Sequence, residues 1–242
     1  MKIIHLIPNL DKGGAERICL DICEELQKNE HSVKVFIFEN INKYLDVYPN
    51  INIEFVPITY KLSLLGKNNI NIELLKQKVD EFAPDAIHSH LYFANIVGLE
   101  LKPKNHIIHV HSNIPSLKKL PITSILNPLK LGIYYEQKKV YRSIKNTNVT
   151  FLTIATESFN YITKNIGYLK PKIVLEHNAI NLDRFKNASS KLVSNRKLNI
   201  ISIGRLVNYK GHDLTIEVAN RLKELKFNFF ISIFGEGEER NS

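Results

Sequence analysis

Short apolar segments alternate along the chain with longer segments in which apolar residues recur every third or fourth position. The short segments predict buried strands, and the longer ones predict helices that bury one face. Strands are expected at residues 2–7, 31–38, 51–58, 85–88, 106–110, 149–155, 172–175 and 229–234. This alternation is typical of an α/β fold with a doubly wound parallel sheet and right-handed crossovers.

Two helices are predicted from the spacing of apolar residues, and the sequence also indicates where the second one ends. Residues 18–27 place apolar side chains on one stripe, and residues 72–82 do the same before the pair Ala83-Pro84. The residue before a proline avoids the helical region, so the second helix should end there. Residues 198–225 predict one further strand and helix.

The domain organisation follows from the position of a polar stretch. Residues 186–197 are rich in Asn, Ser and Lys, as interdomain linkers are. We therefore predict a first Rossmann-like domain over residues 1–185 and the beginning of a second over residues 198–242. That second part holds only two predicted strands and one helix, which should leave apolar surface uncovered.

Composition excludes a membrane-spanning protein. Of the 242 residues, 44% are hydrophobic, enough for a substantial core, yet no apolar run approaches the length of a bilayer span. The apolar start is interrupted at Pro8, too early for a signal peptide. A cytoplasmic location is expected.

The two cysteines, Cys19 and Cys23, are four residues apart on a predicted helix with apolar neighbours. No second Cys or His pair has the spacing of a metal site. We interpret them as core thiols rather than metal ligands.

The net charge of +9 arises entirely from residues 114–242, since acidic residues slightly outnumber basic ones before that point. Such an asymmetry indicates an anionic partner. Nucleic acid, an acidic membrane surface and a nucleotide sugar are all compatible with the charge alone.

A candidate anion site lies where the strand before Gly204 gives way to the next helix. Arg205 and Lys210 follow that glycine, and a helix is predicted to start at His212. A loop that leads into a helix N-terminus favours anions, and two long cations could clamp a diphosphate. The alternative is an ordinary surface turn.

The run Gly204-Arg205-Leu206, followed by Lys210-Gly211-His212-Asp213, resembles the donor-phosphate loop of family 4 glycosyltransferases, which are retaining enzymes of the GT-B architecture. The resemblance implies that Gly204, Arg205 and Lys210 bind the donor. The turn containing Gly235 and Gly237 is similar to the family's next donor-side loop.

Gly13-Gly14-Ala15-Glu16-Arg17 resembles the first loop of the same family. By that resemblance, Gly13 and Gly14 line the interdomain cleft and present backbone donors. Glycine pairs by themselves more often make turns. The pair lacks the three spaced glycines of a dinucleotide site, so a nicotinamide cofactor is disfavoured.

Histidines gather at two predicted strand ends, in His88-Ser89-His90 and His109-Val110-His111. Residues two apart on a strand face the same side, so each pair should lie on one face. His111 resembles the family's cleft histidine near the reacting end of the sugar, where it would hydrogen-bond and polarise. Some of the others are interpreted as structural. Metal binding by these four histidines is conceivable, but no metal is expected because the family's enzymes are not built around one and no carboxylate lies near in sequence.

The segment 173–185 is similar to the strand and Asn-Gly-Ile-Asp-like turn that precede the family's second domain. Ala179 stands where the family has Gly, which puts the local backbone geometry in question, and Asn181 replaces the usual Asp.

Residues 114–146 interleave apolar and basic side chains. A solvated helix face explains this pattern, and so does a surface that binds anionic lipid.

The resemblance implies a retaining glycosyltransferase that moves a sugar from a nucleotide-sugar donor to a glycan or lipid-linked acceptor in polysaccharide or glycoconjugate biosynthesis. It covers about the first 60% of a family member and omits the family's later glutamate pair, so the chain alone is expected to be inactive. No cofactor, no metal and no nucleic-acid partner are expected; a partner chain could supply the missing half. The alternatives are a non-catalytic or partner-dependent acceptor-binding fragment and, third, a nucleotide-sugar epimerase.

Overall fold

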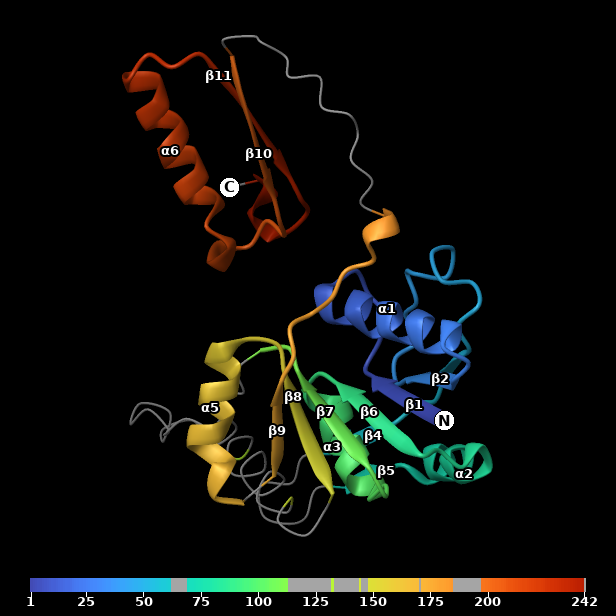
Figure 1. Cartoon of the computed structure of the whole chain (residues 1–242). Coiled ribbons are helices and arrows are strands. Elements are labelled where there is room, and N and C mark those ends of the chain that lie inside the picture. Colours follow the sequence, from blue (N-terminus) through green and yellow to red (C-terminus); the bar gives the residue numbers. More distant parts are fainter. Residues whose placement is uncertain are drawn as a thin grey trace. The chain divides into compact units, whose positions relative to one another are not determined.

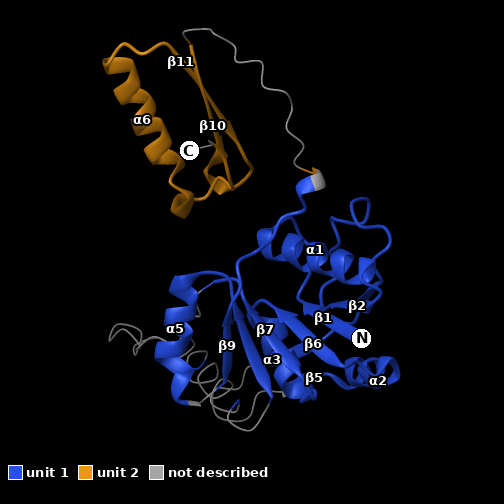
Figure 2. Ribbon diagram, viewed as in Figure 1, with its two compact units in different colours: residues 1–182 blue, residues 183–242 orange. Residues whose placement is uncertain are grey.

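The structure is a computed structural model that describes residues 1–61, 69–112, 132, 144, 148–169, 171–184 and 197–241. The chain divides into two compact units, Met1–Leu182 and Asp183–Ser242 (Figure 2). Each unit is described by itself.

The first unit is built on a seven-stranded parallel sheet of order β3-β2-β1-β6-β7-β8-β9 (Figure 1). Its strands are β1 (Lys2–Ile7), β2 (Ser32–Ile37), β3 (Ile53–Phe55), β6 (Ala86–His90), β7 (His106–Val110), β8 (Val149–Thr153) and β9 (Lys172–Leu175). From β1 the chain adds β2 and β3 on one side, and it then crosses back to add β6, β7, β8 and β9 on the other side of β1. The carboxyl ends of β1 and β6 therefore form a topological switch point, where open α/β sheets bind ligands.

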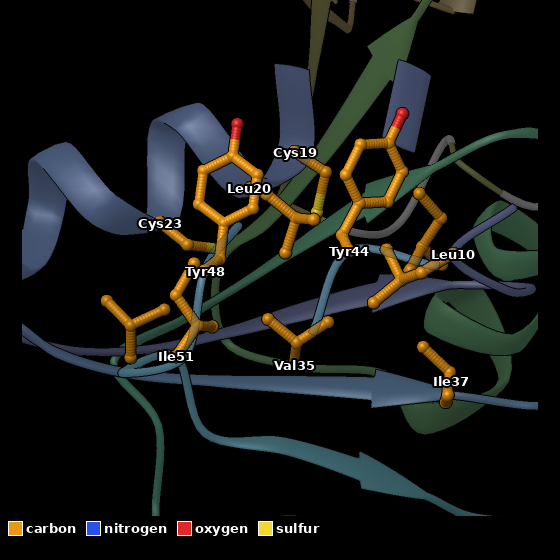
Figure 3. Packing of buried hydrophobic residues seen from close by; sticks show 11 residues of the cluster. Leu10, Cys19, Leu20, Cys23, Val35, Ile37, Tyr44, Tyr48 and Ile51 are labelled. Atoms are coloured by element: carbon orange, nitrogen blue, oxygen red, sulfur yellow. The ribbon is translucent and has the colours of Figure 1, made fainter. Parts of the chain in front are cut away.

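Helices cover both faces of this sheet. Figure 1 shows α1 (Gly14–Lys28) on one face and α2 (Glu73–Phe82) and α3 (Tyr92–Leu101) on the other. The core under α1 contains Val33, Val35 and Ile37 of β2, seen from close by in Figure 3. Helix α5 (Thr156–Ile166) packs on β7 and β8 through a third core cluster.

The sequence predictions for this sheet are largely confirmed. β1, β7 and β9 have the predicted bounds, and α2 ends at Ala83 as expected. β3 is shorter than predicted, since only Ile53–Phe55 pair with β2. The antiparallel pair β4 (Thr59–Lys61) and β5 (Asn69–Asn71) was not predicted, because neither strand has a long apolar run.

β6 extends two residues beyond its predicted end, to His90. The backbone of Ser89 is paired with both β1 and β7 and that of His90 with β7, and the two polar side chains find partners within the protein. A strand can continue through buried polar residues when their hydrogen bonds are satisfied.

The second unit contains one parallel strand pair and one long helix. It comprises β10 (Leu198–Ile203), the 3₁₀ turn η6 (Asn208–Lys210), α6 (His212–Glu224), β11 (Phe229–Phe234) and the 3₁₀ turn η7 (Glu238–Asn241). None of its described residues is fully buried. Ile203 remains 80% exposed and Phe230 55% exposed, so apolar surface stays uncovered as expected from two strands and one helix.

Candidate active site

Five histidines form a continuous row across three neighbouring strands, at the carboxyl half of the sheet. The pairing register sets His5 of β1 opposite His88, and His90 opposite His109, so these side chains share one face. His111 follows directly after β7 on that same face. The histidine row, His5, His88, His90, His109 and His111, therefore crosses the switch point of the sheet.

Hydrogen-bond distances link the members of the histidine row to one another. His5 Nδ1 lies 3.1 Å from His90 Nε2, and His90 Nδ1 lies 3.0 Å from His111 Nε2. His88 Nε2 lies 3.2 Å from His109 Nδ1, and the rings of His109 and His111 stack with centroids 4.1 Å apart. Each linked pair needs one proton between its two nitrogens, which neutral imidazoles supply.

Burial lowers the pKa of His88, His90, His109 and His111 and keeps these four rings neutral at pH 7. His5, His88, His90 and His109 are buried, and only His111 is partly exposed. Burial lowers the pKa of His111 to about 4, while burial and the neighbouring His111 and His5 lower the pKa of His109 to about 3. At neutral pH, His111 can therefore offer one nitrogen as a donor or an acceptor without carrying charge.

The segment after β9 reaches the histidine row. Asn178 lies near His109, whose buried Nε2 makes no hydrogen bond among the described residues, and His177 Nδ1 lies 2.8 Å from the carbonyl oxygen of Ile154, just after β8. Ala179 does not have a positive φ. Alanine therefore adopts the backbone conformation at this position without strain, although the family has glycine there. The sequence placed Asn178 in a turn and did not connect it with the histidines.

His106 lies apart from the row, on the opposite face of β7. Its Nε2 donates to Ser89 Oγ at 2.8 Å, and Ser89 in turn donates to Asn95 Oδ1 at 2.8 Å. Gly98 of α3 leaves room for this ring, since a Cβ there would lie 2.5 Å from His106 Nε2. His106 is thus a structural histidine held through Nε2, while its buried Nδ1 has no hydrogen-bond partner among the described residues.

The loop between β1 and α1 carries Gly13 and Gly14. The Gly13 N–H donates to the Tyr44 hydroxyl at 3.3 Å, and that hydroxyl donates back to the Gly13 carbonyl at 3.1 Å. The Glu16 carboxylate folds over Gly13, where its charge suits the helix N-terminus. The Gly14 position is open, with nothing within 4 Å of a Cβ placed there. Of the two glycines, Gly14 is the freer one to approach a ligand.

In the second unit, Tyr209 brings the two predicted donor-binding cations together. Arg205 donates a hydrogen bond to the Tyr209 hydroxyl, and its guanidinium carbon lies 5.8 Å from the ring centroid. Lys210 Nζ lies 5.9 Å from the same centroid. Tyr209 is 70% exposed, and both cations are exposed, so the three side chains form one open, positively charged surface. The sequence analysis did not single out Tyr209, although its position between the cations was visible.

The glycines of this unit that were predicted to approach the donor allow two loops to pack closely. A Cβ at Gly235 would lie 1.8 Å from the Gly204 carbonyl oxygen, and one at Gly237 would lie 2.1 Å from that of Leu206. The Leu206 N–H donates to the Glu236 carbonyl at 2.9 Å. Gly235 and Gly237 are therefore required by loop packing, whether or not they also approach a donor.

Two other predictions lie largely outside the described residues. The basic and apolar surface was predicted at residues 114–146, of which only 132 and 144 are described, and the linker at 186–197, of which only 197 is. Among the described residues, no helix is both long and apolar enough to cross a membrane.

The fold places the chain in a known class of protein. A glycosyltransferase from Rickettsia africae superposes with a TM-score of 0.63 at 17% identity, over 98% of this chain and 69% of that one. TarM from S. aureus, solved in complex with Fondaparinux, alpha-GlcNAc-glycerol and UDP, gives a TM-score of 0.65 at 10% identity, over 99% and 73%. The architecture is that of the GT-B glycosyltransferases.

The family follows from the sequence itself. The model of Glycosyltransferase Family 4 matches residues 12–184, and the chain belongs to this family. An uncharacterized 41.2 kDa protein in the cps region of Klebsiella pneumoniae is 27% identical over 152 residues. That match spans 53% of this chain and 42% of the relative, less than half of the relative's length.

Proposed function

We propose that the chain is the acceptor-side domain and the beginning of the donor-side domain of a retaining glycosyltransferase. It would transfer a sugar from a nucleotide-sugar donor to a glycan or lipid-linked acceptor in glycoconjugate biosynthesis. The observation that carries the proposal is the histidine row, which crosses the switch point of the sheet and ends in the partly exposed, neutral His111 after β7.

His111 is suited to polarise a sugar rather than to attack it. A neutral, partly exposed imidazole that contacts other imidazoles presents a single hydrogen-bond donor or acceptor, and its low pKa prevents it from acting as a strong base. Charge that develops at the anomeric centre would be stabilised most by such a fixed, desolvated group. Gly14 would contribute backbone N–H groups from the start of α1.

The donor diphosphate is assigned to the surface formed by Arg205, Tyr209 and Lys210. As the glycosidic bond breaks, the leaving diphosphate gains negative charge, so cations on it favour the transition state over the ground state. The proposal needs no metal to stabilise the leaving diphosphate, because Arg205 and Lys210 supply the positive charge. The UDP bound to TarM supports a nucleotide diphosphate as the ligand class.

The acceptor class is supported by the descriptions of relatives. The K. pneumoniae relative is described as lying in a cps region, and WaaG is described as a glycosyltransferase involved in lipopolysaccharide biosynthesis. WaaG superposes with a TM-score of 0.59 at 12% identity, over 96% of this chain and 63% of that one. A lipid-linked acceptor would be met at the inner face of the membrane, and the excess of basic residues after residue 113 fits an anionic lipid surface.

A second candidate function is an acceptor-binding fragment that needs a partner chain for catalysis. The exposed apolar surface of the second unit favours it, because an isolated domain would bury such residues. The family match gives no support to the epimerase alternative.

Nucleotide binding tests the donor assignment directly. Ligand-observed NMR with UDP, ADP and GDP should detect a diphosphate that binds the full chain. Replacing Arg205 or Lys210 with Ala should weaken binding about tenfold, the loss of one charge-assisted contact worth roughly 1.4 kcal/mol. Lys223→Ala removes an exposed cation from the end of α6 and is the matched control. Equal affinities in all four proteins would refute the donor site.

Transfer assays separate the two candidate functions. The 242-residue chain, supplied with nucleotide sugars and acceptor glycans, is expected to show no turnover alone. Addition of a separately expressed remainder of a homologous donor domain should produce transfer if the chain is half of an enzyme. Donor binding without transfer in any such mixture would favour the acceptor-binding fragment.

A further inference from the structure

Helix α1 places two thiols against the start of the histidine row. Cys19 and Cys23 are one helical turn apart and fully buried, and Figure 3 shows both among the residues packed between α1 and the strands. His5 of β1 is also fully buried, with its Nδ1 3.9 Å from Cys19 Sγ. One donor atom from each of the three residues lies within 4.8 Å of the others.

We propose that Cys19, Cys23 and His5 bind a soft divalent metal ion, Zn²⁺, inside the acceptor-side domain. The site goes beyond the function proposed above, although it shares His5 and His90 with the histidine row that ends in His111. His90 is the candidate fourth ligand, because its Nε2 lies 3.1 Å from His5 Nδ1. The resulting Cys₂His₂ set is one that tetrahedral zinc sites use.

The distances are close to those that zinc requires. Zinc–sulfur and zinc–nitrogen bonds of about 2.3 and 2.0–2.1 Å place ligand atoms of a tetrahedron roughly 3.3–3.8 Å apart. The observed separations are 3.9 Å between Cys19 Sγ and His5 Nδ1, and 3.1 Å between His5 Nδ1 and His90 Nε2. All three donor atoms of Cys19, Cys23 and His5 lie within 4.8 Å of one another, so side-chain rotations that move them by up to about 1 Å would satisfy the metal.

Charge balance favours the Cys19–Cys23–His5 group over the two groups that consist of histidines alone. His5, His88 and His90 also bring donor atoms together, as do His90, His109 and His111. An ion held by neutral imidazoles alone would keep its double positive charge in a buried site, which is costly without a carboxylate. Two thiolates cancel that charge, so the Cys19–Cys23–His5 site is neutral and can be buried.

The outer surroundings of the site also fit. A histidine that binds a metal through one nitrogen usually donates a hydrogen bond from the other. His90 Nδ1 is placed to do so, 3.0 Å from His111 Nε2. Since the three principal ligands are fully buried, the metal would enter as the domain folds and would then tie α1 to β1.

Metal loading of the full chain is the first test. The protein is unfolded under reducing conditions and refolded with ZnCl₂ or CoCl₂, and bound metal is measured after gel filtration. We expect one ion per chain and, with Co²⁺, both a thiolate-to-cobalt charge-transfer band in the near ultraviolet and the visible bands of tetrahedral cobalt. Cys19→Ser and Cys23→Ser should lose the ultraviolet band, whereas His31→Asn, at the partly exposed start of β2, should keep it.

A second measurement covers variants that fail to fold. The chain has only two cysteines, so titration of the zinc-loaded wild-type protein with a mercurial reagent should release zinc in step with two thiols. Absence of bound metal after refolding would overturn the proposal. So would cobalt bound without a thiolate band, or zinc retained after both thiols have reacted, since either result would place the ion on histidines alone.

Discussion

His90 Nδ1 lies 3.0 Å from His111 Nε2, so the most exposed histidine of the row is hydrogen-bonded to a fully buried one. Only one of these two nitrogens can carry the proton between them. The tautomer of His90 therefore decides which nitrogen of His111 is a donor. The contact between His5 Nδ1 and His90 Nε2 couples the tautomers of these two residues in the same way. Strand β1 thus influences the hydrogen bonding of His111 through two neighbouring strands.

The buried histidines predict a pH-dependent stability. The folded-state pKa of His106 and His111 is about 4 and that of His109 about 3, all lowered mainly by burial, below the unfolded value of about 6.5. Below pH 6.5 the unfolded chain therefore binds more protons, and the free energy of unfolding falls as pH drops towards 4. Each such histidine contributes a slope of up to about 1.4 kcal/mol per pH unit.

Urea unfolding from pH 8 to pH 4 measures this dependence. We expect a nearly constant midpoint above pH 7 and a steep decline below pH 6. His109→Gln should reduce the slope, whereas substitution of His31, which is not part of the row, should leave it unchanged. A midpoint that is constant down to pH 5 would show that these histidines are not buried as described.

Tyr209 is expected to position the two donor-binding cations. Tyr209→Phe removes the hydroxyl that accepts from Arg205 but keeps the ring near Lys210, so it should weaken nucleotide diphosphate binding about two- to threefold. Tyr209→Ala removes both contacts and should cost about tenfold, because each cation–π contact at an exposed site contributes about 0.5–1 kcal/mol. Isothermal titration of the two variants with the diphosphate found to bind provides the comparison. Tighter binding by Tyr209→Ala would indicate that the ring blocks the site.

Close packing at Gly98 gives a stability prediction. A Cβ at this position would overlap the His106 ring, 2.5 Å from its Nε2, and would displace the hydrogen bond to Ser89. Gly98→Ala should therefore lower the free energy of unfolding by roughly 1–3 kcal/mol, despite the better helix propensity of alanine. Gly167→Ala is the matched control, since its Cβ would meet Thr163 at an ordinary 3.6 Å. Thermal unfolding that ranks Gly98→Ala at or above the wild type would contradict the packing argument.

The sequence predicted the sheet well because its strands are apolar runs bounded by polar turns. The bounds of β1, β7 and β9 could be read from that contrast alone. β4 and β5 were missed, since three-residue strands show no hydrophobic period. Both members of the Arg205–Lys210 pair were recognisable in the sequence, and only the structure shows that Tyr209 lies against both.

The contact between thiols and histidines could not be predicted from the sequence. Cys19 and His5 are separated by a loop and part of a helix, and no local spacing relates them. They meet because α1 packs back onto β1, its own preceding strand. The same applies to Asn178 and His109, which the order of the sheet brings together across two strands.

The second unit should self-associate through the sheet face that α6 does not cover. The pairing register sets Asn199 opposite Phe230 and Ile203 opposite Phe234, and the three apolar side chains of these pairs are more than half exposed. Ile203→Lys combined with Phe230→Lys should reduce concentration-dependent association, because like charges on a sheet face oppose pairing of copies. Sedimentation velocity over a range of protein concentrations measures the change, with Leu214→Lys combined with Ile216→Lys on α6 as a control of equal charge. If both variants and the wild type sediment as the same monomer at every concentration, this face does not drive association.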